Sequence, residues 1–236
     1  MLRRGGGIVS RVYGRWSQFI DYYERGLFAR SSGNEACIRM YVLTCMPRVT
    51  TVDLFEFLSG ATHAVRRVYD ELYAAETGIT YPNVEIDRLK QLVANDAVLA
   101  TLTRKPQRQA QQLAVHSEPR KTKLALEGLE IRHIGLASVD YRMEQIPEGR
   151  AKQLGYHEDE WLRMEVAYEL VEHIRVSAAH NVSAAIDDFQ TFETTFTWTF
   201  ESNVSDPSQL DWTIVDASDF QETPAIMKRT PRRPLG

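Results

Sequence analysis

Residues 192–200 have the sequence Phe-Glu-Thr-Thr-Phe-Thr-Trp-Thr-Phe, and this stretch decides the fold. Aromatic side chains occupy positions 192, 196, 198 and 200, whereas the odd positions carry Glu or Thr. Apolar and polar residues that alternate with a period of two are typical of a strand with one buried face. We therefore predict a strand here, with its aromatic side directed into the core.

Three further strands are expected around this one. Residues 210–217 follow the turn sequence Asp206-Pro207-Ser208 and should form a hairpin with it. In 129–143 the apolar residues occupy odd positions, and in 162–176 they occupy even positions. The even set consists of Leu162, Met164, Val166, Tyr168, Leu170, Ile174 and Val176. Both stretches are predicted to be long antiparallel strands with one exposed face.

The residues before these strands follow a helical period instead. Over 54–72 apolar residues recur at intervals of three and four, which predicts a long amphipathic helix. Asp53 and Glu56 form a variant of the capping box at its start. Gly78 and Pro82 are expected to end it.

A second helix is predicted over 83–104, followed by a polar loop or frayed helix over 105–122. Helices followed by a run of strands indicate an α+β fold. We expect N-terminal helices packed on a strongly curved antiparallel sheet of about four strands, which together make a cone-shaped barrel with an apolar mouth. The predicted core comprises Phe57, Leu58, Tyr168, Phe196, Trp198, Trp212 and Ile214.

The chain of 236 residues is long enough for one full domain with tails. We assign 1–35 to a basic amphipathic presequence or arm, 36–220 to a single α+β cone domain, and 221–236 to a basic C-terminal tail. Hydrophobic content of 43% and charged content of 25% exclude a disordered chain. Cys37 and Cys45 cannot form a disulfide framework. No run of 18 apolar residues occurs, so no membrane-spanning helix is expected.

The net charge of −4 conceals an uneven distribution. Residues 1–50 hold eight Arg against three acidic residues, whereas 140–225 hold eighteen acidic residues against five basic ones. The C-terminal end is basic again, with Lys228, Arg229, Arg232 and Arg233. Because phosphate contacts require Lys and Arg, nucleic-acid binding is not expected except through the basic tails.

The N-terminus has the pattern of a basic amphipathic helix. One helical arc contains Ile8, Val9, Val12, Trp16, Phe19 and Ile20, with several Arg beside it. Three interpretations remain open: a mitochondrial presequence, a helix that contacts an anionic membrane or a partner, and a surface helix packed on the domain. For the second interpretation, the expected contact residues are Arg4, Arg11, Arg15, Trp16 and Phe19.

Several parts of the sequence carry a resemblance to a known family. One matching segment opens the long helix and reads Phe55-Glu56-Phe57-Leu58-Ser59-Gly60-Ala61. Another follows it and reads Leu89-Lys90-Gln91-Leu92-Val93-Ala94. Two more segments belong to the expected closing hairpin, namely Phe200-Glu201-Ser202 and Leu210-Asp211-Trp212-Thr213-Ile214-Val215-Asp216. Over about 40–220 the chain resembles the family of the m-AAA protease-interacting protein of the mitochondrial matrix and of the C-terminal domain of the inner-membrane import-motor anchor.

This family has the cone fold also seen in nuclear transport factor two, and its mitochondrial members bind proteins at the matrix face of the inner membrane. The resemblance implies a non-enzymatic protein-binding module in the mitochondrial matrix, peripheral to the inner membrane, that assists import, maturation or assembly of inner-membrane proteins. The implied partner is an inner-membrane protein complex, either a protease, a translocase or a ribosome. Any peripheral membrane contact would fall to the N-terminal half. Because the family includes a ribosomal large-subunit protein, a structural subunit of a mitochondrial ribosome or respiratory assembly is an alternative.

The sequence contains no spacing typical of catalysis, cofactor binding or metal binding. It lacks GxSxG, P-loop and GxGxxG patterns, and its six His have no metal-ligand spacing. We therefore expect no catalytic, cofactor-binding or metal-binding residues. The acidic run Glu158-Asp159-Glu160 is expected to be a solvated turn. One enzymatic alternative remains, an isomerase or dehydratase that uses the cone cavity, with the candidate residues Tyr141, His133 and Asp140.

Overall fold

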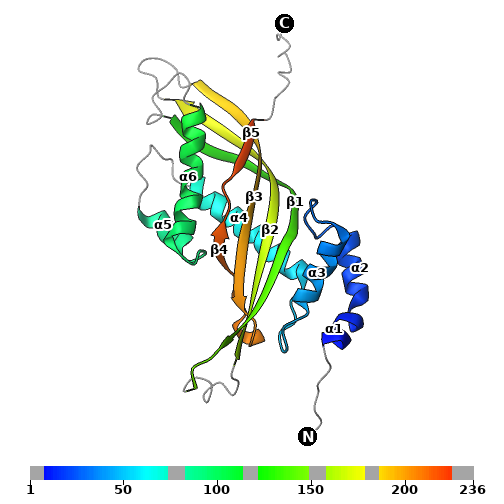
Figure 1. Cartoon of the computed structure of the whole chain (residues 1–236). Coiled ribbons are helices and arrows are strands. Elements are labelled where there is room, and N and C mark those ends of the chain that lie inside the picture. Colours follow the sequence, from blue (N-terminus) through cyan, green and yellow to red (C-terminus); the bar gives the residue numbers. More distant parts are fainter. Residues whose placement is uncertain (1–7, 74–82, 114–121, 149–157, 179–185, 225–236) are drawn as a thin grey trace.

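The computed structural model describes residues 8–73, 83–113, 122–148, 158–178 and 186–224. The fold is α+β, with helices first and a five-stranded antiparallel sheet afterwards (Figure 1). The strands are β1 (Thr122–Gln145), β2 (Glu158–Ala178), β3 (Ile186–Asn203), β4 (Thr213–Ala217) and β5 (Gln221–Pro224).

The sheet is open, with β1 along one edge and β4 and β5 one after the other along the free edge of β3. Four strands were expected, and the described part of the chain has five. The additional strand, β5, begins at Gln221, where the sequence predicts a tail.

The two long strands β2 and β3 alternate as predicted. In β2 every even position from Leu162 to Val176 is buried, and Tyr168 pairs with Phe196 of β3. Val166 pairs with Trp198 in the same register. The predicted hairpin from β3 to β4 is also present, with the Asp206 carboxylate accepting a hydrogen bond from the Ser208 backbone N–H at 2.9 Å.

Strand β1 does not keep a single alternation along its length. Its pairing with β2 shifts by one residue at three places, namely between Leu126 and Gly128, Ile131 and His133, and Leu136 and Ser138. Each extra residue moves the inward side chains from even to odd positions or back. The inward residues are consequently Leu124, Leu126, Leu129, Ile131, Ile134, Leu136, Val139 and Tyr141. Met143, predicted inward, is exposed.

Six helices of the described chain cover the sheet. The long helix α4 (Leu54–Tyr73) crosses it, and the Asp53 carboxylate caps α4 by accepting the Phe55 and Glu56 backbone N–H groups at 2.8 and 3.1 Å. Beside the β1 edge lie α1 (Ile8–Gly14), α2 (Trp16–Glu24) and α3 (Asn34–Thr44), whereas α5 (Asn83–Lys90) and α6 (Asp96–Leu113) lie beside β4 (Figure 1). No described helix is long and apolar enough to cross a membrane.

Three helix predictions differ from the structure. The helix expected over 83–104 is two helices, and 105–113, expected as a loop or frayed helix, is the second half of α6. Pro106 lies inside this helix. The N-terminal helix is also divided, because Arg15 leaves helical geometry between α1 and α2. Gly78 and Pro82, the expected helix stop, lie outside the described residues.

The N-terminal helices share one core with the sheet. Val12, Phe19 and Tyr22 are buried in it. Phe28 forms a parallel bridge to Leu136, where the Leu136 N–H donates to Leu27 O at 2.9 Å. The first described residues, within the segment 1–35, are therefore packed on the domain.

The structure buries Phe57, Leu58, Tyr168, Phe196, Trp198 and Ile214. Trp212, also predicted for the core, is half-buried and packs on the Phe57 ring with centroids 4.7 Å apart.

Candidate functional site

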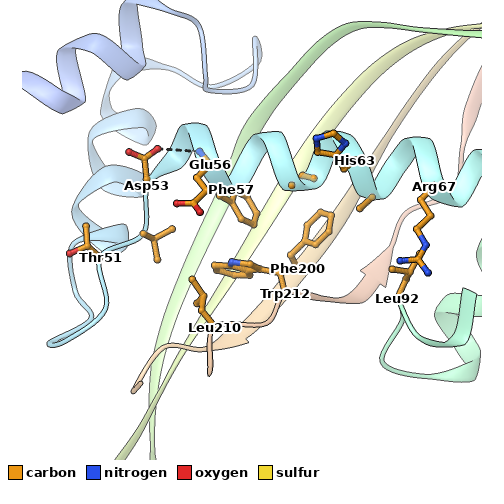
Figure 2. A pocket seen from close by; sticks show the side chains of 14 residues that line it. Thr51, Asp53, Glu56, Phe57, His63, Arg67, Leu92, Phe200, Leu210 and Trp212 are labelled. Carbon is orange, nitrogen blue, oxygen red and sulfur yellow. Dashed lines mark hydrogen bonds between the residues drawn. The ribbon is translucent and has the colours of Figure 1, made fainter. Parts of the chain in front are cut away.

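An apolar groove runs along α4 where the helix passes the ends of β3 and β4. It encloses about 450 Å³. Phe57, Phe200 and Trp212 form its floor, and the Phe57 and Phe200 ring centroids lie 5.7 Å apart (Figure 2). Leu92 and Leu210 continue the apolar surface. The groove exists because α4 presents small residues, Gly60, Ala61 and Ala64, on this side.

The two ends of the groove carry opposite charges. Asp53 and Glu56 lie at the N-terminal end of α4, and Arg67 lies at the far end beside Leu92 (Figure 2). The Asp53 carboxylate caps the helix. Within the described part of the chain, the side chains of Glu56 and Arg67 form no hydrogen bond or ion pair. Both charges are therefore free to meet a bound molecule.

A second surface lies on the outer side of α1 and α2. We define the apolar stripe as Val9, Tyr13, Trp16, Ile20 and Tyr23, and all five side chains are exposed. Tyr13 and Val9 are the most open, with 74% and 63% of their surface accessible.

The stripe continues onto α3. The Tyr23 hydroxyl donates to Asn34 Oδ1 at 2.6 Å, and the Trp16 ring lies 6.5 Å from that of Tyr41. These two contacts make α2 and α3 antiparallel neighbours. Ile38, exposed midway between Asn34 and Tyr41, therefore lies beside the stripe.

The residues predicted for membrane or partner contact are divided between the two sides of α1 and α2. Trp16 is in the stripe, whereas Phe19 is buried against Tyr41 with ring centroids 5.2 Å apart. Arg11 donates to the carbonyl oxygens of Cys45 and Met46 at 3.2 and 3.1 Å, and Arg15 donates to Thr51 Oγ1 at 2.9 Å. Arg4 lies outside the described residues.

A buried charged cluster lies between α4, α6, β2 and β5. The Lys105 ammonium pairs with Glu172 at 2.9 Å and also with Glu222. Glu172 accepts further hydrogen bonds from the Tyr69 hydroxyl at 2.8 Å and from Gln109 Nε2 at 3.0 Å. The Lys105 and Glu172 side chains are fully buried.

The cluster holds two carboxylates around one ammonium. Burial raises the pKa of Glu222, although Lys105 acts in the opposite direction. Burial and the neighbouring Glu172 carboxylate raise the pKa of Tyr69 well above its ordinary value. A cavity of about 490 Å³, lined by Arg108, Gln111, Gln112, Phe220 and Glu222, lies beside it. Because Lys105 of α6 pairs with Glu172 of β2 and with Glu222 of β5, the cluster ties α6 to the sheet.

Sequence reasoning missed this cluster, although one signal was available. Glu172 occupies an even position of β2, between Leu170 and Ile174, where alternation directs a side chain into the core. A carboxylate there requires a buried partner. The partner lies in a segment, 105–113, that the sequence pattern does not mark as helical.

The residues of the enzymatic alternative do not share a cavity. Asp140 and Tyr141 are neighbours along β1, so their side chains point to opposite faces of the sheet. Asp140 is exposed. Burial, followed by the effect of Glu160, raises the pKa of Tyr141 to about 12. The Nε2 of His133 is buried and has no hydrogen-bond partner among the described residues.

Glu160 of the acidic run and the two cysteines are buried. Glu160 is buried rather than in a solvated turn, and it pairs with Arg48 Nε at 3.1 Å. The pKa values of Cys37 and Cys45 are raised by burial, which disfavours the reactive thiolate.

Among the described residues no group of three or more His, Cys, Asp or Glu could hold a metal ion. Two described surfaces remain for the recognition of another molecule. One is the groove, which has an apolar floor and charged ends, and the other is the apolar stripe. No model of a known protein family matches the chain, and no curated protein matches it.

Proposed function

We propose that this chain is a non-enzymatic protein-binding module at the matrix side of the mitochondrial inner membrane, where it assists import, maturation or assembly of inner-membrane proteins. The family resemblance over about 40–220 supports the location and the class of partner. The partner is an inner-membrane protein complex of the protease, translocase or ribosome type.

The observation that carries this proposal is the apolar stripe on α1 and α2. A folded domain that already buries Val12, Phe19 and Tyr22 would gain by burying further apolar side chains, yet the stripe remains exposed. Exposed apolar patches of this kind mark interaction sites. Tyr and Trp, which supply three of its five residues, are enriched at protein interfaces.

The proposal includes the cone-shaped barrel of the family. The three shifts in β1 support it, because bulges bend a strand and increase its twist. Under this proposal α4 occupies the inside of the cone and the groove is part of its mouth.

The test is recovery of partners from mitochondria. The tagged full-length chain, crosslinked in isolated mitochondria, should recover subunits of one inner-membrane complex, and Ile20→Asp should reduce that recovery at least about tenfold. Ser17→Asp is the matched control, because Ser17 is exposed on the same helix outside the stripe. Equal recovery with both variants would contradict the proposal. Sedimentation with mitochondrial ribosomes that survives both variants would favour a ribosomal subunit instead.

A further inference from the structure

We propose that the groove beside α4 binds a short extended segment of a partner protein, apolar in its centre, basic at the Glu56 end and acidic at the Arg67 end. This inference rests on the proposed protein-binding function and names the chemistry of the segment that is bound.

The apolar centre follows from the floor of the groove. Trp212 and Leu92 are only half-buried, and Leu210 is 37% exposed, above the buried rings of Phe57 and Phe200. Covering these side chains with an apolar segment removes their remaining surface from water, which is favourable.

The charges at the ends follow from the periodicity of α4. Glu56 and Arg67 are eleven positions apart, which is close to three full turns, so both lie on the side of the helix that lines the groove. Gly60 and Ala64 lie between them on the same side. Neither charge has a partner among the described residues. A ligand with only one carboxylate, such as a fatty acid, would leave Glu56 without a counter-charge.

The extended conformation follows from the distance between the charges and the size of the groove. Eleven residues of α-helix span about 16 Å, and the groove alongside them has a volume of about 450 Å³. A bound helix would need about eleven residues to reach from one charge to the other, so this volume favours an extended chain, which needs fewer. An extended chain advances about 3.3 Å per residue, so about five residues separate the two charges.

Gly60 provides a test that leaves the fold intact. A Cβ added at this position meets no atom within 4 Å, so Gly60→Leu places a side chain in the groove without displacing the core. Ser59→Leu is the matched control, because Ser59 is exposed on the same helix and does not line the groove. Arg67→Glu makes both ends acidic, and Arg66→Glu is its control outside the groove.

The probes are three fluorescent, end-blocked heptapeptides with the centre Ser-Leu-Phe-Leu-Ser. Their terminal residues are Lys and Glu, Lys and Lys, or Glu and Glu. Fluorescence anisotropy with the full-length chain should show the Lys and Glu peptide bound about twofold to fivefold more tightly than the other two, the range expected for exposed ion pairs. Gly60→Leu should weaken its binding at least about tenfold, and Ser59→Leu should not. Arg67→Glu should make the Lys and Lys peptide the tightest ligand, whereas Arg66→Glu should keep the original order.

The inference is overturned if none of the peptides binds saturably at millimolar concentration, or if Gly60→Leu and Ser59→Leu bind alike. It is also overturned if the peptides do not bind but octanoate quenches Trp fluorescence in a manner that Gly60→Leu abolishes, because the groove would then hold a small carboxylate. These outcomes can be told apart from a failure of the proposed function. Loss of peptide binding with intact stripe-dependent partner recovery would reject the groove and keep the function. Peptide binding without stripe-dependent partner recovery would keep the groove as a peptide site and reject the proposed function.

Discussion

At the scale of single residues, two tryptophans with the same predicted role differ in their burial. Alternation along the strands places Trp198 and Trp212 on the inward side, but only Trp198 is fully buried, among Tyr168 and Phe196. Trp212 keeps one face open to the groove. The sequence pattern identifies the side of the strand correctly, but it cannot show that Trp212 lies opposite the glycine and alanine residues of α4.

Trp198→Ala should lower the free energy of unfolding by about 3–5 kcal/mol, because it leaves a cavity in the centre of the core. Trp212→Ala should cost less, about 1–2 kcal/mol, because solvent can enter the space it leaves. Urea unfolding measures both values. A larger loss for Trp212 than for Trp198 would show that the register of β3 is wrong.

Lys105 is the cation of the buried charged cluster. Lys105→Met leaves Glu172 and Glu222 buried without their cation, so it should lower the free energy of unfolding by about 3–5 kcal/mol. Arg104→Met, at the exposed neighbouring position, should change it by less than about 0.5 kcal/mol. Similar stability of the two variants would contradict the buried cluster.

Glu222 gives the cluster a defined pH dependence. Burial raises its pKa in the folded chain, so the folded state binds this proton more tightly than the unfolded state does. Its contribution to stability is therefore fully present below the ordinary carboxyl pKa of 4.5 and is lost as the pH rises through the raised pKa.

Glu222→Gln removes this titration. Between pH 7 and pH 5 the parent chain should gain stability relative to the variant, because only the parent chain takes up this proton. Urea unfolding of both proteins at the two pH values measures the difference. Parallel pH profiles would contradict burial of this carboxylate in the cluster.

At the scale of elements, the sequence predicts regular segments well and their irregularities poorly. The period of two locates β2 and β3, and the period of 3.6 with the Asp53 cap locates α4. In β1, however, Ile134 and Leu136 break the predicted parity, because three bulges reset it. A bulge depends on the partner strand, which the local sequence does not contain.

For a similar reason, the sequence left the second half of α6 open between a loop and a frayed helix. Pro106 and the polar residues of 105–113 disfavour an amphipathic helix by local criteria. The segment is helical because Lys105 and Gln109 reach Glu172, which is 63 positions beyond Gln109. Tertiary contacts therefore override the local preference.

Gly135 shows how closely the N-terminal helices are attached to β1. A Cβ at this position would lie 2.6 Å from Phe28 C and 2.7 Å from Ala29 N, both backbone atoms that cannot move alone. Gly135→Ala should therefore separate the bridge between Phe28 and Leu136 and lower the free energy of unfolding by about 1–3 kcal/mol.

Gly128→Ala is the matched control on the same strand. Its Cβ would meet the His173 side chain at 3.3 Å, which can move aside, so a smaller loss is expected. Thermal unfolding of both variants measures the losses. An equal loss would mean that the contact between residues 28 and 136 does not hold the N-terminal segment.

At the scale of the whole molecule, two kinds of surface contact differ in their response to salt. Contacts through the apolar stripe bury hydrocarbon surface and should persist as salt rises, whereas contacts through the basic ends are screened. The buried Phe19 and Tyr22 also make the helices carrying the stripe part of the folded domain, so the stripe is held in a fixed position.

The central claim, that the stripe binds a protein of the inner membrane, is tested most directly by site-specific photocrosslinking. A benzophenone amino acid replaces Tyr13 in the stripe or, as the control, Phe189, an exposed aromatic residue of β3. In intact mitochondria, position 13 should yield adducts with one inner-membrane protein, and position 189 should not. Position 13 should still yield these adducts when the mitochondria are lysed at high salt before irradiation. Adducts from position 189 alone, or none from position 13, would contradict the account.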